Sequence, residues 1–98
     1  MLTSYPELRT FLDNHVDNVL SKLGTEFHSA NFIETFRLLY PNEYAHALQF
    51  AKTYGLLHSW IARCYLAKCN KIKDLGIDPK LRKSTLGNPT RNHHWKKL

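Results

Sequence analysis

Six histidines and two cysteines are the residues that could hold a metal, but their spacing does not favour that chemistry. Four of the histidines stand alone in the sequence, at His15, His28, His46 and His58. The adjacent His93 and His94 would point to opposite faces of a strand. Cys64 and Cys69 lie five residues apart, about 140° around a helix, which is poor for shared ligation. We therefore expect no metal site and no cofactor.

Catalytic motifs are also missing from the chain. The sequence holds no Gly-rich phosphate loop, no G-x-S-x-G turn and no H-E-x-x-H pair. No apolar run reaches the roughly 18–20 residues of a membrane span. The N-terminus lacks the basic segment and apolar stretch of a secretory signal. These features predict a non-enzymatic, cytoplasmic protein with reduced cysteines and no membrane partner.

Charge is distributed very unevenly between the two halves of the 98-residue chain. Residues 1–54 hold four Lys or Arg and six Asp or Glu, a net charge of −2. Residues 55–98 hold ten Lys or Arg and two Asp, a net charge of +8. Asymmetry of this kind indicates an anionic partner, with nucleic acid as the first candidate.

Apolar periodicity predicts four helices and a mainly α fold. The first follows an S-x-x-E capping box at Ser4 and Glu7 and ends at Gly24. Residues 25–28 could form an edge strand. A second helix ends before Pro41, and Asn42 can cap a third. The fourth covers residues 57–73, with an inward stripe listed here: Leu57, Ile61, Cys64, Tyr65, Cys69 and Ile72.

Residues 47–66, ALQFAKTYGLLHSWIARCYL, carry the most informative spacing in the chain. The small Ala51 is suited to a close helix contact, and Gly55 is suited to a turn that needs positive φ. Leu56, Ile61 and Cys64 are placed to bury a second helix against the first. This segment resembles the helix-turn-helix of DNA-binding repressors, although Leu57 is apolar where that family usually has a polar residue. The resemblance implies a compact four-helix domain that reads duplex DNA.

A recognition helix after Gly55 would lie in the major groove if the resemblance holds. Its projected outer face carries Ser59, Arg63, Ala67 and Asn70, with His58 near the helix start. Arg63 could bind guanine and Asn70 could bind adenine, while Lys71 would neutralise a phosphate. The alternative for Arg63 is simple solvation on an exposed face.

The C-terminal residues 80–98 are expected to form a basic hairpin or a tail packed on a helical domain of residues 1–79. The turn signal Gly87-Asn88-Pro89-Thr90 would pair the segments LRKSTL and RNHHWKK. With the preceding helices, such a hairpin fits a winged-helix variant. Its cations would contact the DNA backbone or minor groove: Arg82, Lys83, Arg91, Lys96 and Lys97.

Two other function classes stay open on the sequence. A small interaction module or inhibitor, of the type that mobile elements or phages encode, could bind an acidic surface on a larger protein. Trp60, Leu66 and Tyr54 would be its contact residues if they were exposed. An RNA-binding protein could instead stack Trp95 on unpaired bases. A DNA-reading repressor would normally form a homodimer, and the first helix could supply the interface.

Overall fold

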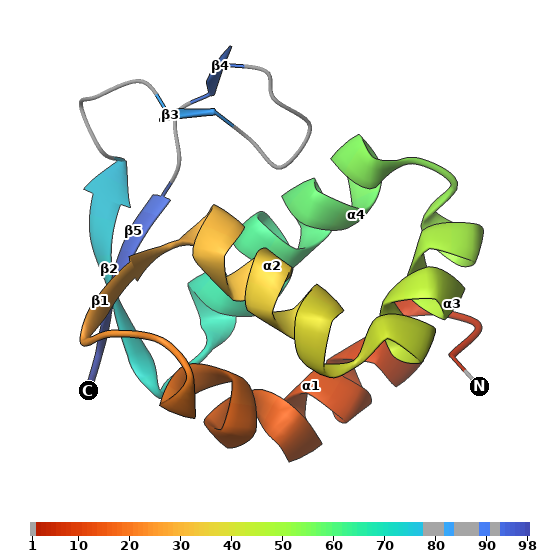
Figure 1. Cartoon of the computed structure of the whole chain (residues 1–98), viewed down its shortest axis with the longest axis horizontal. Coiled ribbons are helices and arrows are strands. Elements are labelled where there is room, and N and C mark those ends of the chain that lie inside the picture. The colour runs from red at the N-terminus through yellow and green to blue at the C-terminus, as the bar shows by residue number, and fades with distance from the viewer. Residues whose placement is uncertain (1, 78–81, 84–88, 91–92) are drawn as a thin grey trace.

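A computed structural model describes residues 2–77, 82–83, 89–90 and 93–98 of the chain. The fold is mainly helical, with a small antiparallel sheet (Figure 1). In chain order the helices and strands are α1 Tyr5–Ser21, β1 Glu26–His28, α2 Ser29–Leu39, α3 Pro41–Ala51, α4 Tyr54–Trp60, β2 Ile72–Ile77, β3 Arg82–Lys83, β4 Pro89–Thr90 and β5 His93–Lys97. None of the described helices is both long and apolar enough to cross a membrane.

Helix α4 continues without a break into a π-helical turn, Ile61–Tyr65, and a short 3-10 turn, Leu66–Lys68. The predicted fourth helix therefore exists, but it begins earlier and ends earlier than residues 57–73. Residues 72 and 73, expected at the end of that helix, are the first two residues of strand β2.

Helix α1 begins where the sequence predicts, but Ser4 and Glu7 do not form the expected reciprocal capping box. The Glu7 carboxylate accepts the backbone N–H of Thr3 at 3.1 Å and the Ser4 hydroxyl at 3.2 Å. The Ser4 side chain makes no cap bond to the helix backbone. The hydrogen bonds from Thr3 lower the pKa of Glu7. The helix ends at Ser21, three residues before the expected stop at Gly24.

The junctions of α3 also differ from prediction. Tyr40 is both the C-cap of α2 and the N-cap of α3. Pro41 is therefore the first residue of α3, and Asn42 is not the cap. Proline suits this first position because its missing N–H would have no helical partner there. The turn into α4 is made by Lys52 at φ 76°, and the Thr53 hydroxyl accepts the Leu56 N–H at 3.1 Å.

Gly55 is therefore not the turn residue of the helix pair. It is the second residue of α4 and does not have positive φ. The positive φ lies three residues earlier, and the residue that adopts it is a lysine. Ala51, expected between the two helices, is buried, whereas Leu56, expected to be buried with Ile61, is 58% exposed.

Strand β5 is the centre of a three-stranded sheet with the order β1-β5-β2. It pairs antiparallel with both neighbours, and Trp95 lies opposite Phe27 on one side and Asp74 on the other. The expected edge strand at residues 25–28 is confirmed as β1. By contrast, the segment RNHHWKK was expected to pair with LRKSTL, and the structure pairs its residues 93–97 with β1 and β2.

The C-terminal strand is consequently part of the core and not a tail. Trp95 is 1% exposed, and its indole N–H donates to the buried Ser29 hydroxyl at 2.8 Å. Helices α1, α2 and α3 supply most of the other core side chains, which include Leu8, Leu12, Val16, Phe32, Phe36, Tyr44 and Ala47. Leu57 of α4 and Ile61 of the π-helical turn complete this side of the core. A boundary at residue 79 would separate β2 from β5, although these two strands are paired with each other.

Candidate nucleic-acid interface

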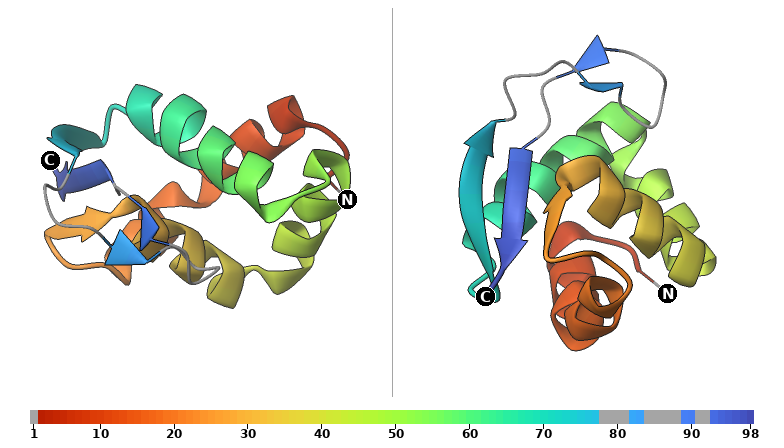
Figure 2. Two further views of the ribbon diagram at one scale, coloured as in Figure 1. Left: turned by 90° about the horizontal axis from the view of Figure 1, so that it is seen from above. Right: turned by 60° about the vertical axis from the view of Figure 1, so that its left-hand side comes forward.

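Helix α4 and its π-helical extension present one buried side and one exposed side. Leu57 and Ile61 are 0% exposed and pack into the core. Ser59, Arg63 and Ala67 are exposed, as their projection away from Ile61 predicts. In the view from above, no other described helix or strand lies in front of α4 (Figure 2, left). A second molecule could therefore approach this side of α4.

Arg63 is the cation best placed on that side. Among the described residues it has no ion-pair or hydrogen-bond partner. Arg37, on α2, differs because it forms an ion pair with Glu34 one helical turn away, and this carboxylate raises the pKa of Arg37. A guanidinium without a protein partner keeps all of its donors for a ligand.

His58 does not belong to the exposed side, although it was predicted there. Its Nε2 lies 2.8 Å from the hydroxyl of Tyr44, which is buried on α3. Burial, reinforced by the charge of Arg37, lowers the pKa of His58. Burial raises the pKa of Tyr44. His58 therefore helps to join α4 to α3.

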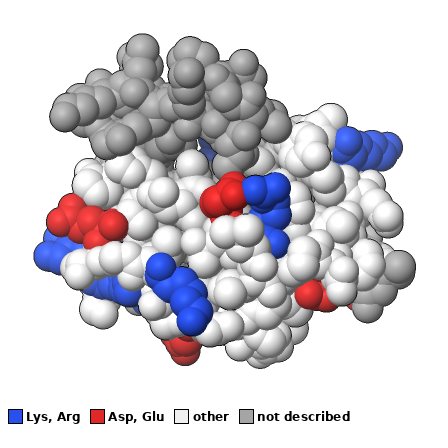
Figure 3. Space-filling view, viewed as in Figure 1, with Lys and Arg blue, Asp and Glu red and all other residues white. Residues whose placement is uncertain are grey.

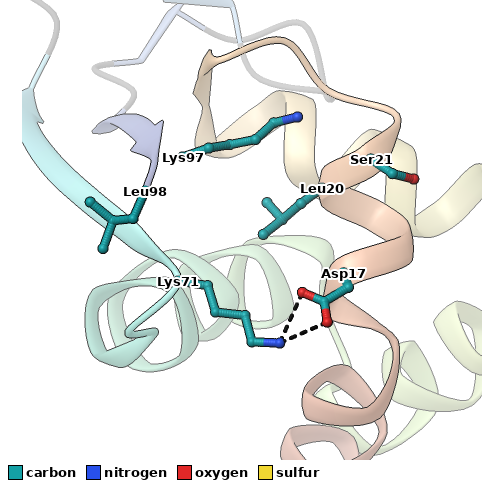
Figure 4. A pocket seen from close by; sticks show the side chains of 6 residues that line it. All are labelled: Asp17, Leu20, Ser21, Lys71, Lys97 and Leu98. Atoms are coloured by element: carbon teal, nitrogen blue, oxygen red, sulfur yellow. Dashed lines mark hydrogen bonds and ion pairs between the residues drawn. The ribbon is translucent and has the colours of Figure 1, made fainter.

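Asn70 and Lys71 also lie elsewhere than predicted. The helix ends at Lys68, so Asn70 sits in the turn before β2 and not on a recognition helix. The Lys71 ammonium contacts both carboxylate oxygens of Asp17 at 2.8 Å (Figure 4). This ion pair joins the turn before β2 to α1 and partly neutralises the lysine that was expected to bind phosphate.

The predicted C-terminal cations that the structure describes belong to strands near the two ends of the β2–β5 ladder. Lys97 lines the same pocket as Lys71, beside Leu98 (Figure 4). Lys96 lies between Glu26 and Lys73 across the three strands. Positions 82 and 83 form β3, which pairs with β4 beyond the opposite ends of β2 and β5 (Figure 1). At 3.3 Å per residue, the six-residue β2 separates these two groups by about 20 Å. Arg91 lies outside the described residues.

The charged side chains in Figure 3 do not gather into one patch. On the described part of that face, Lys and Arg are scattered among acidic and uncharged residues (Figure 3). Within the described ranges, no group of three His, Cys, Asp or Glu could hold a metal ion. Both cysteines are free thiols. His93 and His94 pair with Asp74 and Glu26, each at 3.1 Å.

Several contacts of the candidate interface could not be read from the sequence. Leu66, proposed as an exposed contact residue, is 1% exposed, whereas Tyr54 is 45% exposed. Trp60 is half-buried and stacks on Tyr5 with ring centres 4.9 Å apart. Arg9 of α1 reaches the same place and contacts the π-helical turn. The helical spacing of α1 gives no signal for that long-range contact. Comparison of the chain with protein-family models, curated proteins and solved structures found no match.

Proposed function

We propose that this protein binds duplex DNA as a winged-helix protein, with α4 in the major groove. The observation that carries the proposal is Arg63, which is exposed and has no partner among the described residues, in the π-helical turn that continues α4. The major groove admits an α-helix, and arginine can donate two hydrogen bonds to guanine O6 and N7. Ser59, one helical turn before Arg63, would contact a neighbouring base or phosphate.

The strand arrangement supports the same function. A helix and a strand precede the central helices. The hairpin β3–β4 comes between β2 and β5 in the chain, and these two strands are paired with each other. A hairpin in this place would act as the wing, with Arg82 and Lys83 supplied to the DNA backbone. Phosphate contacts of this kind set orientation and affinity, whereas base contacts set sequence preference. The net charge of +8 over residues 55–98 fits a polyanionic partner.

The test compares Arg63→Ala with Arg37→Ala on two duplexes, one selected from a random pool and one scrambled. Both variants lose one positive charge from an exposed helix. Arg63→Ala should lose about 1–3 kcal/mol of affinity on the selected site and much less on the scrambled one. Arg37→Ala should leave the ratio of the two affinities unchanged. Equal losses on both duplexes for Arg63→Ala would reduce its role to phosphate contact.

A second candidate function is binding to another protein. It is favoured by two large apolar side chains at the start of α4, because Leu56 is 58% exposed and Tyr54 is 45% exposed. Exposed aromatic residues are common anchors of protein interfaces. Wild-type protein that binds neither duplex, even at low salt, would leave this candidate in place of DNA binding.

A further inference from the structure

The π-helical turn Ile61–Tyr65 changes the direction in which the rest of the helix projects. The Leu66 N–H bonds to the Ile61 carbonyl five residues back, in place of the usual four. One additional residue in a turn rotates the residues after it by about 100° relative to a regular helix. This rotation brings Leu66 into the core, and Arg63 lies inside the same turn.

Arg9 of α1 contacts this turn in two ways. Its guanidinium Nη2 donates to the Cys64 carbonyl at 3.1 Å. The centre of the guanidinium also lies 5.4 Å from the ring centre of Trp60 and 5.9 Å from that of Tyr65. A planar guanidinium can donate to a carbonyl from its edge while its faces lie against aromatic rings. Lysine can make only part of this set of contacts.

A second residue of α1 contacts the same turn. Asp13 lies four residues after Arg9, on the same side of the helix, and accepts the Tyr65 hydroxyl at 3.1 Å. One face of α1 therefore binds the backbone and both aromatic rings around the π-helical turn. The backbone bonds of the turn are displaced from the usual helical pattern, and the Cys64 carbonyl within it accepts from a side chain outside the helix.

We propose that Arg9 is the positioning residue of the DNA-reading helix. It holds the π-helical turn and thereby sets the direction in which Arg63 leaves the surface. This inference rests on the proposed function only for its DNA readout, since the turn itself can be followed without DNA. Arg9 is half-buried under α4, so it acts through the helix and not by touching the ligand.

The first measurement follows the π-helical turn through Cys64, which lies in it. In a Cys69→Ser background Cys64 is the only thiol of the chain, and its rate of reaction with a thiol reagent reports how open the turn is. Arg9→Met should raise this rate several-fold while circular dichroism shows the helices intact. Lys22→Met is the matched control, because it removes one exposed cation near the end of α1, and should leave the rate unchanged.

The second measurement is the ratio of affinities for the selected and scrambled duplexes. Arg9→Met should lower the ratio about fivefold or more, because misplacing Arg63 loses its discrimination for guanine. Arg9→Lys keeps the charge and should restore affinity for the scrambled duplex without restoring the ratio. A purely electrostatic role would instead be rescued in full by lysine, and that result would overturn the proposal.

Unchanged Cys64 reactivity in a folded Arg9→Met protein would also overturn it. If Arg9→Met does not fold, Arg9→Lys decides the question by the same thiol rate, with a rate equal to wild type counting against the proposal. If wild-type protein binds no duplex, the proposed function fails, and the thiol rates still establish whether Arg9 holds the turn.

Discussion

Gly55 and Gly76 have different backbone conformations, so substitution by alanine should change the free energy of unfolding in opposite directions. A Cβ added at Gly55 would meet nothing within 4 Å, and this residue sits in the first turn of α4. Gly76 has φ +90°, at the irregularity where β2 pairs with β5. Side chains adopt that region only at a cost of about 1–2 kcal/mol.

Gly55→Ala should therefore raise the free energy of unfolding by about 0.5–1 kcal/mol, because alanine favours helix and restricts the unfolded chain. Gly76→Ala should lower the free energy of unfolding by about 1–2 kcal/mol. Urea denaturation of both variants checks the pair. A destabilised Gly55→Ala protein would show that Gly55 has a turn role that the structure does not give it.

His58 should make stability depend on pH. Burial lowers the pKa of His58 in the folded protein, so the unfolded chain, which titrates near 6.5, binds the proton more readily. The stabilisation is complete above about pH 6.5 and is lost as the pH falls through the folded pKa. The nearby charges are Arg37, which also lowers the pKa, and Glu34, which raises it.

Urea denaturation of wild type and His58→Gln at several values between pH 8 and pH 5 isolates this effect. The difference in stability between the two proteins should be constant above about pH 7 and should shrink below pH 6. A difference that grows on acidification would mean that protonated His58 is the better partner of Tyr44.

At the scale of elements, the helices could be predicted because their signals are local. The features that could not be predicted depend on contacts between residues far apart in the chain. Pro41 and the spacing of buried residues such as Leu8 and Phe32 act within a few residues, so α1, α2 and α3 could be predicted. The π-helical turn depends on Arg9, more than fifty residues away in the chain, and no periodicity reports it. The exposed position of Arg63 could be predicted because it lies on the opposite side of the helix from Ile61.

The pairing of β5 is the clearest case of a missed long-range contact. Of the predicted turn at residues 87–90, Pro89 and Thr90 form β4, which pairs with β3, and Gly87 and Asn88 lie outside the described residues. Trp95 belongs instead to the sheet that closes the core, opposite Phe27. Its indole reaches Ser29 at the start of α2, 66 residues earlier.

A double-mutant cycle on Trp95 and Ser29 tests whether β5 is a core element. Trp95→Phe removes the donor and leaves the buried Ser29 hydroxyl without it, which should cost about 1–3 kcal/mol in addition to the lost packing. Ser29→Ala in the Trp95→Phe background should recover part of this loss. Thermal unfolding of the four proteins gives the coupling. If the effects of the two substitutions on stability simply add, the hydrogen bond between Trp95 and Ser29 contributes nothing to stability.

At the scale of the whole molecule, the sheet connects the two parts of the proposed DNA surface. The inner side of β5 packs on the helical core through Trp95, and the same strand carries one end of the projecting hairpin. The stability of the fold should therefore depend on strands β2 and β5, and the affinity for DNA on the residues that connect them. The paired strands stabilise the fold, while the connecting residues add charge.

A shortened chain separates these two contributions. Ile77 and His93 are directly paired, so residues 78–92 can be replaced by the two-residue turn Asn-Gly, which suits an antiparallel hairpin. This change removes four Lys or Arg, namely Lys80, Arg82, Lys83 and Arg91, together with Asp78. The paired residues of β2 and β5, Trp95 among them, lie outside the removed segment, so thermal unfolding should stay near that of the wild type.

Binding of the shortened chain to duplex DNA should weaken and depend less on salt. Each phosphate contact that is lost reduces the slope of log K against log salt by about 0.9, so four lost contacts would reduce it by about 3.6. The ratio of affinities for selected and scrambled duplexes should remain, because Arg63 is untouched. As a control, Lys52→Ala and Lys73→Ala together remove two exposed cations outside the hairpin. The change in slope for each positive charge removed is then compared between this control and the shortened chain. If the two values are equal, net charge alone, and not the hairpin, determines the affinity.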